Sequence, residues 1–126
     1  MYSTLPTGIK SSITRSISKV FEDYMANIEW SEERFELTDF IKTWKSYIEE
    51  NAGWYKKVPL EVRANPVFHE EVAKKMNETI ERILSEPPSE EQIARIEVKQ
   101  EELNTFFEYS CKAEAAYVEN RLKQLN

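Results

Sequence analysis

Apolar residues recur every three or four positions along most of the chain, a period typical of amphipathic α-helices. The first stripe consists of Ile9, Ile13, Ile17, Val20, Tyr24 and Ile28. The sequence has only two glycines, whereas strands joined by tight turns normally require more. The pattern therefore predicts an all-α fold, with helices at residues 8–29, 31–52, 66–84 and 90–124.

Residues that commonly begin or end helices mark the boundaries. Ser31 suits the N-cap of the second helix, and Gly53 is expected to end that helix in the left-handed conformation. Asn65-Pro66 is typical of an N-cap followed by a first helical residue. Ser89 with Gln92 matches a capping box, which predicts the start of the last helix.

The last predicted helix is longer than the others, because neither proline nor glycine occurs after Pro88. At about 1.5 Å per residue it would be about 54 Å long, against about 33 Å for the first helix. A bend near Asn104-Thr105, an overhang, or a homodimer through residues 105–125 would each resolve this mismatch. The simplest packing is an antiparallel four-helix bundle with a long C-terminal helix, forming one domain over residues 1–126.

Composition limits the location and the partners. The 126 residues are 40% hydrophobic and 32% charged, with a formal net charge of −6. No apolar run approaches the roughly 20 residues of a membrane span, and no secretion signal opens the chain. A single cysteine fits a reducing compartment, so we expect a cytoplasmic protein that binds neither membranes nor, being acidic, nucleic acid.

The residues that carry catalytic or metal chemistry are sparse. His69 is the sole histidine, so the paired Glu-x-x-His motifs of di-iron bundles are missing. Cys111 has no neighbouring base in the sequence, and no phosphate-binding glycine loop is present. Adjacent glutamate pairs diverge on a helix and suit helix starts and solvated faces. We predict no metal, no cofactor and no catalytic residue.

The connector, residues 53–65, is the clearest candidate binding segment, with a short helix expected at residues 59–64. Its aromatic and basic residues are Trp54, Tyr55, Lys56, Lys57 and Arg63. Trp, Tyr and Arg are the types that concentrate binding energy at interfaces. The connector could also close the end of the bundle. Trp54 would then pack over Ile48, and Val58, Leu60 and Val62 would cover the open end. We expect Trp54 to pack inside and Tyr55 and the two lysines to form a rim.

Three functions follow from these observations. The first is a protein–protein interaction module, such as an adaptor, an inhibitor or an immunity-type protein, without catalytic chemistry. The second is a helical bundle that binds an apolar small ligand in a cavity lined by Trp44, Phe40, Phe107 and Met76. The third is an enzyme with an unrecognised site, which an ionisable residue of shifted pKa inside a cleft would reveal.

Overall fold

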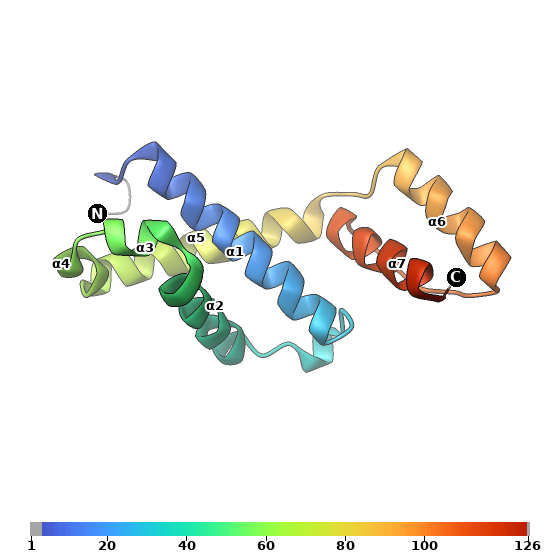
Figure 1. Ribbon diagram of the computed structural model, residues 1–126, viewed down its shortest axis with the longest axis horizontal. Coiled ribbons are helices and arrows are strands. Elements are labelled where there is room, and N and C mark those ends of the chain that lie inside the picture. The colour runs from blue at the N-terminus through green and yellow to red at the C-terminus, as the bar shows by residue number, and fades with distance from the viewer. Residues whose placement is uncertain (1–3, 126) are drawn as a thin grey trace. The chain divides into compact units, whose positions relative to one another are not determined.

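The computed structural model describes residues 4–125 and confirms the all-α fold class, with no β-strand among these residues. None of the helices in this range is long and apolar enough to cross a lipid bilayer. The described elements, drawn in Figure 1, are α1 (Thr7–Asn27), the 3-10 helix η2 (Glu32–Arg34), α2 (Leu37–Asn51), α3 (Gly53–Lys57), α4 (Leu60–Arg63), α5 (Pro66–Ser85), α6 (Glu90–Leu103) and α7 (Lys112–Leu125).

Contacts between residues divide the chain into two compact units, an N-terminal unit of residues 1–80 and a C-terminal unit of residues 81–126. The predicted four-helix bundle is not confirmed, because the last of its four helices is two helices in the structure. The single domain remains a prediction from the sequence.

The core of the N-terminal unit is built from the apolar stripes that the sequence predicts. Phe40 of α2 is completely buried, and its ring centroid lies 5.8 Å from that of Phe21 and 5.9 Å from those of Tyr24 and Phe35. Such aromatic contacts add to the stabilisation from burial. The other buried residues of α1 and α2 are Ile13, Ser16, Ile17, Val20, Met25, Trp44 and Ile48.

The second helix begins at Leu37, so the predicted start at Ser31 is wrong. The Ser31 side chain makes no capping hydrogen bond, and η2 follows it. Glu29 and Trp30, just before, have φ angles of 57° and 56°, and two successive left-handed residues end the first helix and turn the chain. This turn brings the Trp30 ring edge-on to Phe21, at 6.1 Å.

Gly53 begins α3 rather than ending α2 in a left-handed cap. Ala52 ends α2 with a φ of −92°, and neither glycine has a positive φ. The expected short helix at residues 59–64 is confirmed as α4, with Pro59 at its N-cap. The predicted apolar plug is only partly correct, because Val58 is completely buried but Leu60 is 70% exposed.

The start of α5 follows the local signals in the sequence. Pro66 is its first residue, and the Asn65 side-chain oxygen accepts a hydrogen bond of 2.8 Å from the backbone N–H of Val67. This bond satisfies one of the backbone donors left free at a helix start. Phe68, Val72 and Met76 of α5 are buried.

In the C-terminal unit the capping box of Ser89 and Gln92 is confirmed, but the predicted continuous helix over residues 90–124 is wrong. The α6 helix ends at Leu103, and Asn104 takes the left-handed conformation with a φ of 55°. A non-helical segment follows before α7 begins at Lys112. Asparagine tolerates this conformation better than most residues because its short polar side chain bonds locally.

The break turns the last predicted helix into a hairpin of α6 and α7. Its core is Ile96, Ala115, Val118 and Leu122, with Leu103, Phe107, Tyr109 and Tyr117 packed against it. The structure therefore lacks the excess helix length that suggested a homodimer through residues 105–125. The homodimer remains a prediction, but helix length no longer supports it.

One contact of this hairpin gives a pH-dependent prediction. The Tyr109 hydroxyl donates a hydrogen bond of 2.8 Å to Glu97, and burial, followed by this bond, raises the pKa of Tyr109 to about 12. Unfolded tyrosine has a pKa of about 10. The folded chain thus holds the proton more tightly, and this contribution to stability is complete below pH 10 or so and disappears as the pH rises through about 12.

The measurement is an alkaline titration followed by phenolate absorbance. We expect a component near pH 12 in the wild type that is missing from the Tyr109→Phe variant. A titration curve unchanged by this substitution would contradict the assignment.

Candidate functional site

The five predicted binding residues lie on α3 and α4, in the N-terminal unit. Trp54 is only 7% exposed, as expected from its position after α2. Tyr55 and Arg63 are half-buried, and Lys56 and Lys57 are exposed. The structure brings Tyr55 and Arg63 together, with the guanidinium carbon 4.6 Å from the centroid of the tyrosine ring.

Tyr55 and Arg63 line a pocket of about 420 Å³, which we call the α3 pocket. Its walls are mainly apolar and come from α2, α3 and α5, including Ile41, Trp44, Ile48, Trp54, Phe68, Val72, Ala73 and Met76. Its charged residues are Lys45, Glu49 and Arg63. Because Lys45 and Glu49 offset one another, Arg63 gives the pocket a surplus positive charge.

The position of Arg63 is fixed by its surroundings. Its backbone oxygen is hydrogen-bonded to Nε2 of His69, which ties the end of α4 to the first turn of α5. Its Nε atom is buried and has no hydrogen-bond partner among the described residues. A buried donor without an acceptor is unfavourable, so the Arg63 side chain leaves part of its hydrogen-bonding capacity unused.

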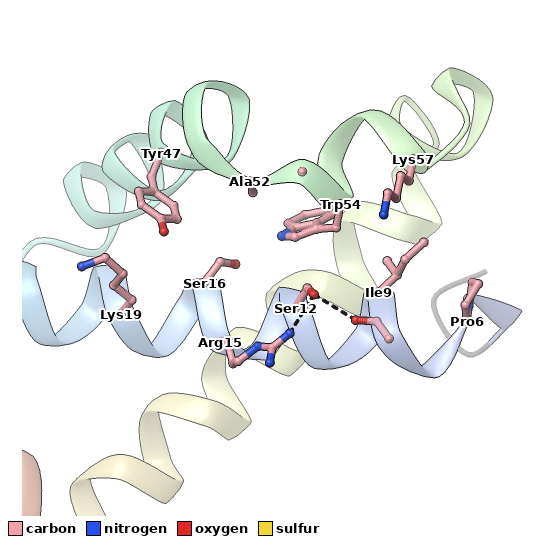
Figure 2. A pocket seen from close by; sticks show the side chains of 12 residues that line it. Pro6, Ile9, Ser12, Arg15, Ser16, Lys19, Tyr47, Ala52, Trp54 and Lys57 are labelled. Atoms are coloured by element: carbon pink, nitrogen blue, oxygen red, sulfur yellow. Dashed lines mark hydrogen bonds between the residues drawn. The ribbon is translucent and has the colours of Figure 1, made fainter.

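A second depression, the α1–α3 groove, also has Trp54 in its lining. It has a volume of about 840 Å³, and Figure 2 shows α1 along one wall and α2 and α3 along the other. Its cationic residues are Arg15, Lys19 and Lys57, and none of the described residues that line it carries a carboxylate. This is unusual for a chain whose net charge is −6.

The cations of the groove differ in their partners. Lys19 forms an ion pair of 3.0 Å with Asp23, and this hydrogen bond raises the pKa of Lys19. Arg15 donates to the Ser12 hydroxyl at 3.1 Å. Within the described residues, Arg15 and Lys57 have no carboxylate within ion-pair distance, so two cations face the groove uncompensated.

Sequence reasoning missed the α1 side of this groove. Arg15 and Lys19 are four residues apart and therefore share a helix face. This spacing was the one feature of the sequence that could have indicated a basic surface on α1. Nothing in the sequence, however, places that face opposite Trp54 and Lys57. Trp54 and Lys57 were predicted only as binding residues of the connector, without their neighbours on α1.

The two residues considered for catalytic or metal chemistry, His69 and Cys111, belong to different units. His69 belongs to the N-terminal unit, whereas Cys111 is buried in the C-terminal unit, just before α7. Within residues 4–125, no group of three His, Cys, Asp or Glu side chains could hold a metal ion. Of the cavity residues predicted for an apolar ligand, Trp44 and Met76 line the α3 pocket, while Phe40 is enclosed by aromatic rings and Phe107 packs in the C-terminal unit.

The α3 pocket and the α1–α3 groove thus share Trp54 as a common wall, and both are built from residues of the N-terminal unit. Comparisons of the chain with protein-family models, with curated proteins and with solved structures find no match.

Proposed function

We propose that this chain is a protein-interaction module that binds its partner through the α3 pocket and has no catalytic chemistry of its own. The observation that carries the proposal is the Tyr55–Arg63 pair at an apolar pocket. The partner would insert an apolar side chain into the pocket and present a carboxylate to Arg63.

The chemistry of Arg63 supports an acidic group in the partner. One face of its guanidinium stacks on Tyr55. This stacking does not occupy the edge of the planar group, where carboxylates bind in a bidentate manner. The Nε atom is buried, so a carboxylate of the partner would bind the terminal nitrogens of the guanidinium.

The surface beside the pocket also favours a macromolecular partner. The helices that supply Arg63 and Phe68 expose Leu60 and Val67, at 70% and 51% of their surfaces. A partner protein that covers these side chains would remove apolar surface from water. Anchoring residues in a pocket surrounded by such contacts are the usual arrangement of an interaction hot spot.

The experiment compares affinity purifications from native lysate with the wild type, Arg63→Ala, Tyr55→Ala and Lys42→Ala as baits. Lys42 is an exposed lysine on α2 that lines neither the pocket nor the groove, so it is a matched control for loss of one charge. We expect one partner protein to be recovered equally by the wild type and Lys42→Ala, and about tenfold less by the two pocket variants. Equal recovery by all four baits would refute the role of the pocket.

The apolar walls of the α3 pocket also favour the second function, binding of an apolar small ligand. Native mass spectrometry of the purified chain distinguishes the two functions. A bound small molecule that Met76→Trp excludes by filling the pocket would support the ligand function. A ligand-free chain that forms a complex with the captured protein would support the interaction module.

A further inference from the structure

The α1–α3 groove offers hydrogen-bond donors and positive charge from both of its walls. Arg15 and Lys19 come from α1, and Figure 2 shows Tyr47 and Lys57 reaching toward α1 from the opposite side. The lining residues within 4–125 include no carboxylate, so an anion that enters the groove is attracted by these cations and is not repelled by a carboxylate of these walls. Both uncompensated cations, Arg15 and Lys57, are exposed and accessible.

Trp54 provides an independent observation that points to a ligand. Its indole N–H is buried and has no acceptor among the described residues, and Figure 2 shows this nitrogen directed into the space between α3 and α1. The neighbouring Trp44, by contrast, donates to Ser16 at 3.1 Å. Because buried polar groups are normally hydrogen-bonded, this unpaired N–H favours an acceptor atom of a ligand bound beside it.

We propose that the α1–α3 groove binds a small molecule carrying a phosphate group. A phosphate has oxygens directed along several axes, so it accepts hydrogen bonds from donors on two facing walls, whereas a carboxylate is planar. Arg15 and Lys57 would neutralise its two charges, and the Trp54 N–H would bond one of its oxygens. The volume of about 840 Å³ leaves space for an organic body beside Ile9 and the Trp54 ring.

The test follows the three tryptophan indole N–H resonances in proton–nitrogen NMR spectra during titrations with inorganic phosphate, adenosine monophosphate and citrate. The Trp54→Phe variant assigns the Trp54 resonance. We expect both phosphate compounds to shift this resonance saturably and citrate to leave it in place. The Trp30 resonance serves as the internal reference, since Trp30 does not line the groove, whereas Trp44 donates to Ser16, which does.

Variants of Arg15 and Lys57 give the decisive comparison. Arg15→Ala and Lys57→Ala remove exposed side chains without ion pairs, so both should fold, and each should weaken phosphate binding by at least about tenfold. Lys42→Ala should bind as the wild type does. The proposal fails if no phosphate compound shifts the Trp54 resonance, if citrate alone does so, or if Lys42→Ala weakens binding as much as Lys57→Ala. These outcomes are independent of partner recovery by the α3-pocket variants.

Discussion

Replacing Phe40 with alanine is expected to lower the free energy of unfolding by about 3–5 kcal/mol. Phe40 is 0% exposed, and its ring contacts those of Phe21, Tyr24 and Phe35. The substitution removes the transfer free energy of a whole ring and leaves a cavity that rigid aromatic neighbours cannot close easily. It also removes the edge-to-face contacts with Phe21 and Tyr24, each worth about 0.5–1.5 kcal/mol beyond burial.

Urea denaturation followed by circular dichroism measures this effect as a lower midpoint concentration. Phe106→Ala is the matched control, because Phe106 is 87% exposed and its removal should change stability by less than about 0.5 kcal/mol. Similar midpoints for the two variants would show that Phe40 is not enclosed as the structure has it.

The helices that the sequence predicts correctly are those whose ends depend on nearby residues. The Ser89–Gln92 capping box and the Asn65 cap form bonds within two or three residues, so the sequence contains both partners of each bond. The buried stripes are predictable for a related reason, since the period of the helix decides which side chains share a face.

The errors occur where tertiary contacts decide the conformation of a residue. Glu29 and Trp30 are left-handed, although neither residue type favours that conformation. Part of the explanation is that the turn places Trp30 against Phe21, nine residues earlier. Gly53 is a residue type that local rules favour as a left-handed cap, but here it begins α3. Trp54, the next residue of α3, is buried.

In the candidate site, too, the features set by nearby residues could be predicted and those set by tertiary contacts could not. Trp54, Tyr55 and Arg63 are close in the sequence, so their gathering beside one pocket could be anticipated. The α1–α3 groove joins Arg15 to Trp54 and Lys57 across about forty residues of chain, a separation at which sequence patterns carry little information on contact. Its donors become recognisable as one site only when the helices are placed.

Replacing Gln100 with methionine is expected to destabilise the α6–α7 hairpin by about 2–4 kcal/mol. In the sequence Gln100 looks like an interruption of an apolar seam, yet its amide holds the break between the two helices. Its Nε2 donates to the Phe107 carbonyl oxygen at 2.9 Å, and its Oε1 accepts from the Phe107 N–H at 2.7 Å and from the Thr105 hydroxyl at 3.0 Å.

Methionine has nearly the same shape but makes none of these bonds, so both backbone groups of Phe107 lose their partners at a site where Gln100 is only 8% exposed. Unpaired groups in a largely buried site cost more than the net gain of the bonds themselves. Hydrogen exchange at the Phe107 amide should accelerate, and the urea midpoint should fall, whereas Gln124→Met, an exposed glutamine of α7, should change neither. An amide that stays protected in Gln100→Met would mean that apolar packing of the hairpin, rather than this side chain, sets where the last helix breaks.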